Sequence, residues 1–407
     1  MVITGLGVIS PLGLESGEFW ANLVAGRSGI APLESLPVAG LRYRRGGEVR
    51  GFLPRREWLA LATGRCSLYL LAAGAEAWAG SGLGAGGERV GVVVASNFGD
   101  VELVEDRLGG RETPPANPQP TVYSLQPIIS PAATLAGLNQ QTLADALSRL
   151  LGARGPSLAL SLSCSSGGAA IAEAFDLIRA GRADVMVAGG ADALSLFAWS
   201  GLSALRAMTS EEMRPFDRRR SGTLFSEGAG VLVLEDFEHA RRRGARMRAE
   251  MLGYGSSNNV HHMAAPPPGG RGLEKAMRAA LEQGGLAPEA VDHINAHGTA
   301  TPGNDATETA AIKAVFGAHA RDIAICSIKA ATGHTMGAAG AIEAIAAILT
   351  LEEGLVPPTL NYGEPDPACD LDYTPNEARR RTLQTALSNS SGIGGNNVAV
   401  LFRRFAR

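Results

Sequence analysis

Short runs of β-branched and other apolar residues alternate along the chain with longer stretches rich in Ala and Leu. The short runs have the length and composition of buried strands, whereas the longer stretches repeat apolar residues at helical spacing. The expected strands are Val2–Thr4, Arg89–Ala95, Leu158–Ser163, Asp184–Ala188, Gly230–Leu234, His293–Ala296, Ile323–Ser327 and Thr385–Ser388. The expected helices include Ala169–Arg179, Leu273–Gln283, Ala306–Phe316 and Ala338–Leu351. This alternation predicts an α/β protein with largely buried sheets.

The C-terminal part predicts a different local arrangement. Two strands, Ala386–Ser388 and Val398–Phe402, flank the glycine-rich segment Ser391–Asn397. Because glycine has no side chain, the backbone of that segment can approach a ligand closely. Two other segments rich in Gly, Pro or polar residues, Arg107–Pro120 and Ala264–Gly270, are predicted to be surface loops rather than interdomain linkers.

Composition narrows the class of protein. The 407 residues are 45% hydrophobic and 19% charged, which favours a folded core and excludes a disordered chain. This length allows two or three domains, or one large duplicated domain. The formal net charge of −3 provides no general basic field, so nucleic acid is not an expected partner.

The cysteines and the N-terminus bear on location. The four cysteines lie far apart without a Cys-x-x-Cys pair, which is typical of a reducing compartment and gives no sign of zinc. The N-terminus lacks a basic segment followed by a long apolar one, and the apolar stretch Ala341–Leu351 is short and interrupted by Glu343. We expect a soluble, cytoplasmic protein that binds neither membrane nor metal.

One cysteine stands at a place suited to a nucleophile. Cys164 lies in the segment Ser161–Gly168, where a strand ends, small residues follow and the helix of Ala169–Arg179 begins. Unpaired N–H groups and the dipole at such a helix start would favour the thiolate. A buried structural thiol is the alternative, and we interpret the other three cysteines, Cys66, Cys326 and Cys369, in that way.

Two further segments carry residues that could act with Cys164. His297 follows a strand and enters a loop of small and hydroxyl residues, where an imidazole could exchange or donate a proton. Lys329 and His334 lie five residues apart on a glycine-rich turn before a helix, and Glu343 is near enough in sequence to neutralise Lys329. Taken alone, each of these residues is better explained as a satisfied histidine or a surface lysine.

Other motifs have weaker signals. The adjacent pair His261 and His262 has no Asp, Glu or Cys at ligand spacing, so it does not predict a metal site. Gly5 and Gly7 imitate half of a dinucleotide fingerprint, but Ser10 stands in place of the third glycine.

Cys164, His297, Lys329 and His334, in that order and in these motifs, resemble the elongating β-ketoacyl-acyl carrier protein synthases of the thiolase superfamily. The resemblance covers nearly the whole chain and includes Val2–Gly7, Arg154–Ser157, Val187–Ala191, Arg214–Asp217, Glu227–Gly230 and Val356–Thr359. It implies a thiolase-like fold of five layers, α-β-α-β-α, from two pseudo-symmetric halves. We place the half that carries the nucleophile at residues 1–240 and the half that carries the catalytic His and Lys residues at 241–407.

The resemblance also implies an activity, which is decarboxylative Claisen condensation of an acyl thioester with malonyl-acyl carrier protein. Cys164 would hold the acyl chain, and His297 and His334 would bind the malonyl thioester carbonyl as the enolate forms. The backbone N–H groups of Cys164 and Ile393 would form the oxyanion hole, while Lys329 paired with Glu343 would organise the site. The residues implied to contact substrate are Thr299, Thr301, Ser391, Gly392 and Gly394.

The implied partners are an acyl carrier protein and a second subunit, either a copy of this chain or a ketosynthase-like chain-length subunit. No cofactor is implied, because phosphopantetheine on the carrier protein holds the substrates. Arginines in the neighbourhood of Arg65, Arg206 and Arg214–Arg220 are expected to dock the acidic carrier protein.

Several positions depart from the family pattern. Ser391 and Ile393 replace aromatic residues, Asn396 replaces threonine and Thr223 replaces phenylalanine. Asn139–Gln141 stands where an aliphatic segment usually lines the acyl pocket and the dimer contact, and its amides would be costly there unless paired. Together with the small residue at Ile393, which would widen the acyl entrance, these changes indicate a specialised polyketide or polyene pathway. Ordinary fatty-acid elongation is the alternative.

Other functions are disfavoured by particular residues. A thiolase would need a second cysteine near Gly394–Asn397, and an initiating ketosynthase would have asparagine in place of His334. A non-catalytic subunit that only sets chain length would lack the nucleophile, and Cys164 is present.

Overall fold

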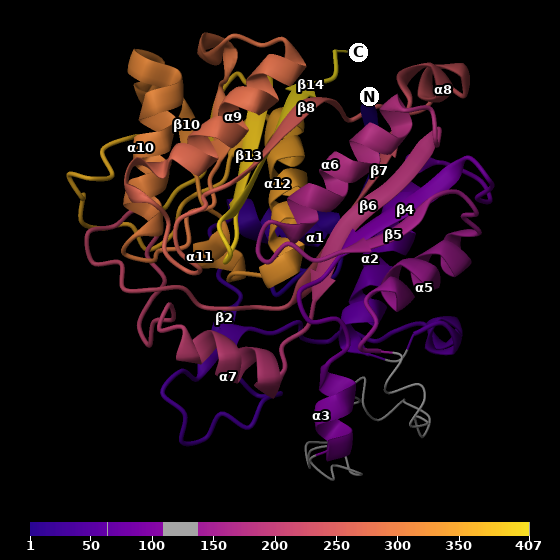
Figure 1. The fold of residues 1–407 in the computed structure, drawn as a ribbon, viewed down its shortest axis with the longest axis horizontal. Helices are drawn as coiled ribbons and strands as arrows, with labels where there is room; N and C mark the ends of the chain where they lie inside the picture. Colours follow the sequence, from indigo (N-terminus) through magenta and orange to yellow (C-terminus); the bar gives the residue numbers. More distant parts are fainter. Residues whose placement is uncertain (63, 109–136, 407) are drawn as a thin grey trace.

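The computed structural model describes residues 1–62, 64–108 and 137–406. Ten strands form one continuous sheet in the order β10-β9-β13-β14-β8-β1-β7-β6-β4-β5 (Figure 1). In chain order these strands are β1 (Val2–Ile9), β4 (Val90–Ala95), β5 (Ser157–Leu160), β6 (Val185–Asp192), β7 (Gly228–Glu235), β8 (Ala249–Asn258), β9 (His293–Asn295), β10 (Ala324–Cys326), β13 (Thr385–Ser391) and β14 (Asn396–Arg404). Two small two-stranded sheets pair β2 (Ile30–Pro32) with β3 (Arg45–Gly47) and β11 (Leu355–Val356) with β12 (Arg379–Arg380).

The two ends of the large sheet repeat one pairing pattern. On one side, β5, β4 and β6 are parallel neighbours, and β6, β7 and β1 follow as antiparallel neighbours. On the other side, β10, β9 and β13 are parallel, and β13, β14 and β8 follow antiparallel. Only Val2 and Ile3 of β1 pair with β8, so two similar five-stranded units are joined by a short seam. The predicted pseudo-symmetry is therefore present in the strand pairing.

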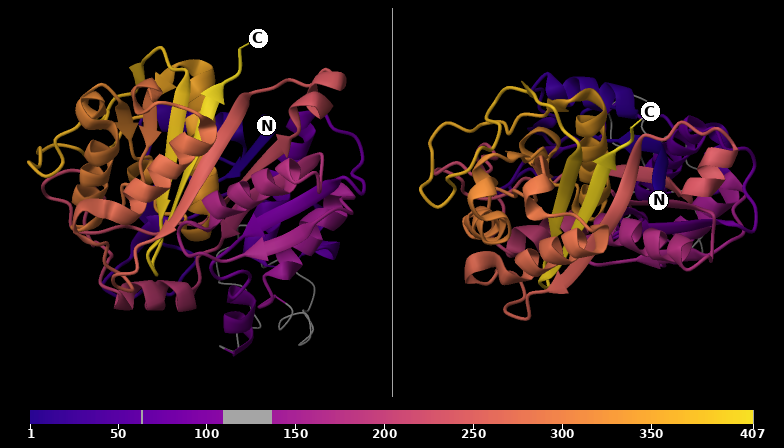
Figure 2. Two further views of the ribbon diagram at one scale, coloured as in Figure 1. Left: turned by 45° about the horizontal axis from the view of Figure 1, so that its top comes forward. Right: turned by 90° about the horizontal axis from the view of Figure 1, so that it is seen from above.

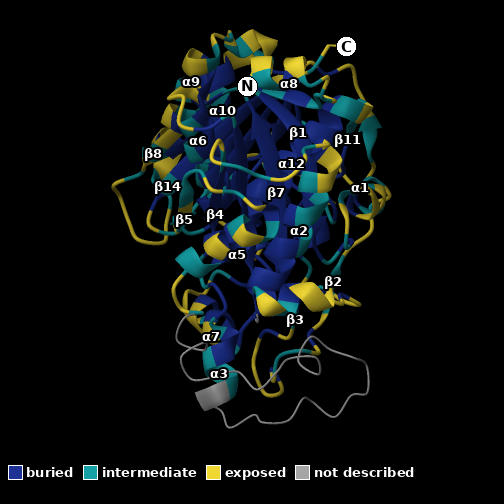
Figure 3. Ribbon diagram, turned by 90° about the vertical axis from the view of Figure 1, so that its right-hand side faces the viewer, coloured by how far each residue is buried: buried dark blue, intermediate teal, exposed yellow. Residues whose placement is uncertain are grey.

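The helices complete five layers. The central layer is formed by α6 (Ser166–Arg179) and α12 (Ala339–Glu353), which contact each other and the inner faces of both five-stranded units. On the outer faces, α2 (Arg65–Ser81) and α5 (Gln141–Leu151) cover the first unit, and α9 (Arg271–Gly284) and α10 (Asn304–Phe316) cover the second (Figure 2). Figure 3 shows that the strands and the central layer are buried, while exposed residues gather on the outer elements. This is the predicted α-β-α-β-α arrangement.

The remaining helices lie at the periphery. They are α1 (Ser16–Val24), α3 (Glu102–Leu108), α7 (Leu196–Ala204) and α8 (Phe237–Arg242). The short helix α11 (Lys329–Thr332) is instead fully buried. No helix in the described residues is both long and apolar enough to cross a membrane.

Glycines set the spacing between β1 and α2. A Cβ on Gly5 would lie 2.0 Å from the carbonyl oxygen of Ala77, and a Cβ on Gly7 would lie 1.9 Å from that of Ala73. Both contacts are far shorter than real carbon atoms tolerate, so the helix can approach the strand only because these residues are glycine. Gly5 and Gly7 therefore serve helix–strand packing, and the fingerprint that they imitate is absent.

The sequence located most elements and missed one long strand. Every predicted strand and helix named above lies on an observed element, with ends that differ by a few residues. The missed strand is β8, whose glycines and polar residues interrupt the apolar pattern. Of the predicted loop Arg107–Pro120, the first two residues end α3 and the rest lie outside the described residues.

Candidate active site

Cys164 lies at the turn between β5 and α6, as the sequence predicts. The preceding residue, Ser163, has a φ of 57°, a left-handed conformation that turns the chain sharply before the helix begins at Ser166. Its carbonyl accepts hydrogen bonds from the Ser166 backbone N–H at 3.1 Å and the Ser166 hydroxyl at 2.6 Å. The turn therefore presents Cys164 in a fixed orientation at the wall of two cavities.

The protonation state of Cys164 differs from the sequence-based expectation. The residue is 6% exposed, and burial raises the pKa of its thiol to about 11. The positive charge of Lys329 and the Ile393 N–H oppose that rise in pKa, but they do not cancel it. The expectation that the helix start favours the thiolate is therefore wrong in its net effect, because desolvation of the charged form is the larger effect.

The glycine-rich segment between β13 and β14 lies against this turn. The Ile393 N–H is directed at the Cys164 thiol, and a Cβ added to Gly392 would stand 3.2 Å from the Cys164 backbone nitrogen. Gly392 thus allows the backbone contact that the sequence predicts. Gly394 does not line either cavity, so its predicted substrate contact stays a prediction. Its N–H donates to the Met263 carbonyl at 2.6 Å and its carbonyl accepts from Asn258 Nδ2 at 2.9 Å.

His297 and His334 meet beside Cys164. Their ring centroids are 5.5 Å apart with an angle of 85° between the planes, and both side chains are buried. Burial lowers the pKa of each imidazole well below its usual range, and Lys329 lowers both further. Both rings are therefore neutral at physiological pH, so each has one nitrogen that donates and one that accepts.

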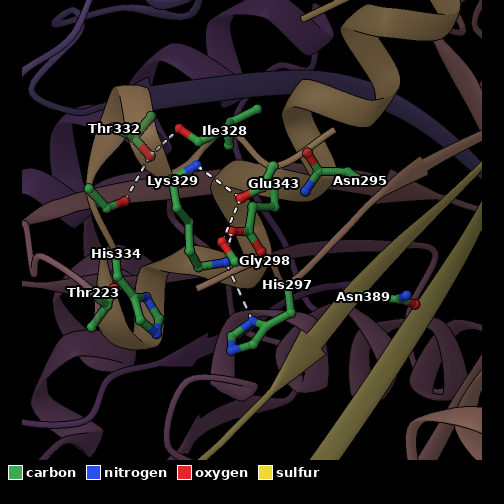
Figure 4. A network of polar contacts seen from close by, with 12 residues as sticks. Thr223, Asn295, His297, Gly298, Ile328, Lys329, Thr332, His334, Glu343 and Asn389 are labelled. Carbon is green, nitrogen blue, oxygen red and sulfur yellow. Dashed lines mark hydrogen bonds and ion pairs between the residues drawn. The ribbon is translucent and has the colours of Figure 1, made fainter. Parts of the chain in front are cut away.

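The neighbours of each ring select its tautomer. The Met336 N–H donates to His334 Nδ1 at 3.3 Å, so the proton of that ring is on Nε2. Lys329 Nζ lies 3.4 Å from His297 Nδ1 and forms a buried ion pair with Glu343 (Figure 4). Because an ammonium only donates, it leaves Nδ1 of His297 as the acceptor and Nε2 as the donor.

Lys329 and Glu343 stand behind the histidines. Both side chains are buried and neither lines a cavity, so they contact the site through His297. Burial raises the pKa of Glu343 above its ordinary value, and the adjacent Lys329 opposes that rise. The pairing that the sequence suggested is present, and Lys329 and His334 converge on one site.

Two buried carboxylates on α10 were missed by sequence reasoning. Glu308 accepts the backbone N–H groups of His297 at 2.9 Å and Gly298 at 2.8 Å, and Asp305 accepts that of Ala300 at 3.1 Å. These bonds hold the loop after β9 against the helix. Only an acidic residue at an otherwise apolar helical position could have signalled them.

Two cavities meet at Cys164, Phe225 and Ile393. One, of about 120 Å³, is lined by both histidines, by Thr223, Thr299, Thr301, Ser391 and Gly392, and by residues 262–267, which overlap the predicted surface loop Ala264–Gly270. Thr299 Oγ1 and Thr301 Oγ1 lie 3.0 Å apart, and the Ser391 hydroxyl donates to Asn397 Oδ1 at 2.8 Å. This cavity is called the access cavity below.

The other cavity, of about 390 Å³, extends from Cys164 in a different direction and is called the acyl cavity below. Its apolar lining is Phe98, Phe197, Ala198, Leu202, Leu205, Phe225, Met336 and Ile393. Asn97, Ser161 and Ser163 add polar groups. Ile393 borders both cavities, and it packs beside Phe225 and Met336.

Asn139–Gln141 does not line the acyl cavity, which corrects the predicted role of this segment. Gln141 accepts the Ala159 N–H at 3.1 Å and donates to Asp145 at 3.1 Å, while Gln140 donates to the Asn97 carbonyl at 3.2 Å. The amides are paired within the chain at the start of α5, so they require no partner subunit.

Arg65 is also placed differently from the prediction. It is 5% exposed and forms an ion pair with Glu227 at 3.5 Å, so it cannot dock a partner at the surface. Arg206 is exposed at the end of α7, next to Ala207 in the lining of the access cavity. Within Arg214–Arg220, Arg219 and Arg220 pair with acidic neighbours.

Comparison with known proteins identifies the family. Residues 1–240 match the N-terminal domain of beta-ketoacyl synthase, and residues 248–363 match its C-terminal domain. The chain belongs to the β-ketoacyl synthase family. It is a 3-oxoacyl-acyl carrier protein synthase, an acyltransferase that forms carbon–carbon bonds in fatty acid or polyketide biosynthesis.

Relatives of two kinds resemble this synthase along its full length. It is 37% identical to 3-oxoacyl-[acyl-carrier-protein] synthase 2 of Synechocystis, covering 100% of this chain and 98% of that protein. It is 39% identical to nodulation protein E of Rhizobium meliloti, covering 99% of each.

Solved ketosynthases share the fold. The ishigamide ketosynthase/chain length factor superimposes with a TM-score of 0.89 at 34% identity, covering 100% of this chain and 99% of that one. A type II polyketide ketosynthase bound to a hexaketide, in complex with its acyl-carrier protein, superimposes with a TM-score of 0.86 at 33% identity. The match covers 100% of this chain and 99% of that one.

Proposed function

We propose that this synthase extends the acyl chains of a specialised polyketide or polyene pathway, with Cys164 as the acyl carrier. The Cys164 thiol gives up its proton and its sulfur attacks the carbonyl of an incoming acyl thioester, and the carrier-protein sulfur leaves and takes up that proton. The observation that supports this role is the meeting of both cavities at Cys164. One cavity accommodates the acyl chain while the other admits the phosphopantetheine arm past Thr299 and Thr301.

The histidines act in the next step. Loss of CO₂ from the malonyl group leaves an enolate, whose oxygen accepts hydrogen bonds from Nε2–H of His297 and His334. Since both rings are neutral and have Nδ1 occupied as an acceptor, they offer these donors without a change of protonation. Each donor aimed at developing charge contributes about 3 kcal/mol to lowering the barrier.

Condensation follows at the acyl cysteine. The enolate carbon attacks the Cys164 thioester carbonyl, whose oxygen becomes an oxyanion between the N–H groups of Cys164 and Ile393. This attack forms the new carbon–carbon bond, and collapse of the oxyanion intermediate breaks the carbon–sulfur bond and releases the Cys164 thiolate. The β-ketoacyl chain leaves on the carrier protein.

The specialised pathway is supported by the acyl cavity. Ser161 and Ser163 are among its lining residues, the first exposed and the second half-buried. A saturated chain would displace water from their hydroxyls and leave them unpaired, whereas a keto or hydroxyl oxygen could bond to them.

The proposed partners follow from the surface. The exposed Arg206 beside the access cavity suits an acidic carrier protein, and β5 leaves a sheet edge where a second subunit could pair. We propose that the protein forms a dimer, either with a second copy of this chain or with a chain-length subunit. Within this chain, we propose that residues 1–240 and 241–407 form the two halves.

Competition between matched primers tests the pathway. Wild-type enzyme should load polyenoyl or 3-ketoacyl carrier protein onto Cys164 faster than a saturated chain of equal length, as measured by intact mass. Ile393→Phe should narrow the accepted range, because a larger side chain fills the border of both cavities. Equal or faster loading of the saturated primer, with Ile393→Phe indistinguishable from wild type, would favour ordinary fatty-acid elongation.

A further inference from the structure

Asp192 is a fully buried carboxylate at the end of β6, outside the residues to which a role has been given above. It accepts hydrogen bonds from the Ser96 hydroxyl at 2.7 Å and from the N–H groups of Asn97 at 3.1 Å and Phe98 at 3.0 Å. A fourth donor, the Gly337 N–H, reaches its Oδ2 at 2.6 Å. One side chain therefore joins the end of β4 to the turn that precedes α12.

The groups that Asp192 joins belong to different parts of the site. Asn97 and Phe98 line the acyl cavity. Gly337 directly follows Met336, whose N–H holds Nδ1 of His334. The contact is tight, since a Cβ on Gly337 would lie 2.7 Å from Asp192 Oδ2. Movement of the carboxylate would be transmitted to the peptide that selects the tautomer of His334.

The charge of Asp192 has an electrostatic cost. Burial raises its pKa to about 6, and the four donors oppose that rise, so it is ionised at neutral pH. Its negative charge raises the pKa of Cys164 and that of the buried thiol Cys66. Within the described residues, no ion pair compensates this carboxylate. The negative charge of Asp192 therefore disfavours the Cys164 thiolate. Its four hydrogen bonds indicate that the carboxylate serves to hold the surrounding backbone in place.

We propose that Asp192 is a positioning residue that fixes the ring of His334, and so its enolate-binding Nε2–H, relative to Cys164. The proposal rests on the function proposed for His334. Without the carboxylate, the turn at Met336 loses its anchor and the Nε2–H of His334 is no longer held in one direction. Decarboxylation therefore weakens, whereas the Cys164 thiol becomes easier to ionise.

The test uses Asp192→Asn in two backgrounds. In Cys164→Gln, whose amide imitates an acylated cysteine, CO₂ release from malonyl-acyl carrier protein should fall about 10–100-fold, as expected for loss of a supporting hydrogen-bond partner. In the enzyme with Cys164 intact, alkylation by iodoacetamide at pH 8 should be equal or faster. Glu76→Gln is the matched control, because Glu76 also accepts several donors but on the outer side of the sheet. It should not change the ratio of the two rates.

Three outcomes would overturn the inference. CO₂ release within twofold of the Asp192 parent would show that His334 needs no such anchor. A parallel fall in CO₂ release and alkylation would show general disorder instead of positioning. Absence of CO₂ release from Cys164→Gln with Asp192 intact would overturn the proposed function itself, and the inference with it.

Discussion

The reactivity of Cys164 depends on a balance between burial and nearby positive groups. Lys329 and the Ile393 N–H favour the thiolate, yet burial raises the pKa of the thiol to about 11. In the unloaded enzyme the cysteine is therefore mostly a thiol at neutral pH. Its proton must leave as the acyl thioester binds.

This balance predicts a steep pH dependence of alkylation. Only the thiolate reacts. As long as the pH is below the pKa, each increase of one pH unit raises the thiolate fraction about tenfold. The rate of iodoacetamide labelling at Cys164 should therefore rise about 100-fold from pH 7 to pH 9. Cys164→Ala measured in parallel corrects for the other three thiols. A plateau below pH 8 would indicate that the helix start outweighs desolvation.

Single residues also show what the sequence could and could not reveal. Cys164, His297, Lys329 and His334 were identified because each stands in a local motif of a known family. Asp192 and Glu308 could not be identified, since their donors are set by tertiary contacts, such as that between Asp192 and Gly337. Arg65 was misassigned because an arginine in a sequence is read as exposed, whereas Glu227 neutralises it in the core.

At the scale of elements, backbone contacts between segments distant in sequence build the site. The β13–β14 loop reaches the β5–α6 turn only because Gly392 leaves room beside the Leu162 carbonyl, 3.0 Å from an added Cβ, and the Cys164 nitrogen, 3.2 Å from it. The sequence indicated this approach through its glycines. It did not indicate β8, whose polar and glycine residues hide a strand that pairs with β14 along its full length.

Gly392→Ala is predicted to reduce condensation without unfolding the protein. The methyl group forces the loop to retreat by a few tenths of an ångström, which moves the Ile393 N–H away from the developing oxyanion. Turnover should fall about 10–100-fold, somewhat less than loss of an oxyanion-hole donor. Gly87→Ala is the control, since its Cβ meets no atom within 4 Å. Unchanged turnover in Gly392→Ala, with intact melting behaviour, would place the oxyanion hole elsewhere.

At the scale of the whole molecule, the fold brings two halves of one chain to a shared site. Cys164 comes from the first five-stranded unit, and the histidines come from loops of the second. The short seam between β1 and β8, together with the contacts of α6 with α12, fixes their relation. Resemblance predicted this architecture, while local pattern alone predicted only alternating strands and helices.

Carrier-protein docking is predicted to depend on salt. The exposed Arg206 adjoins the access cavity, and Debye screening weakens such long-range attraction. The KM for malonyl-acyl carrier protein should rise several-fold between about 50 and 300 mM salt, and Arg206→Glu should raise it at low salt with little change in kcat. Arg242→Glu on α8, at the opposite end of the molecule from α7 (Figure 1), is the control. A KM insensitive to both salt and Arg206→Glu would exclude electrostatic docking at this surface.

The most direct test of the account measures CO₂ release and carbon–carbon bond formation separately. Cys164→Gln should release CO₂ from malonyl-acyl carrier protein without forming any β-ketoacyl product, because the histidine donors remain but no acyl carrier does. Adding His334→Ala should reduce that release by at least about 100-fold, as removal of a donor from developing charge does. Condensation that persists in Cys164→Gln, or CO₂ release unaffected by His334→Ala, would contradict the account.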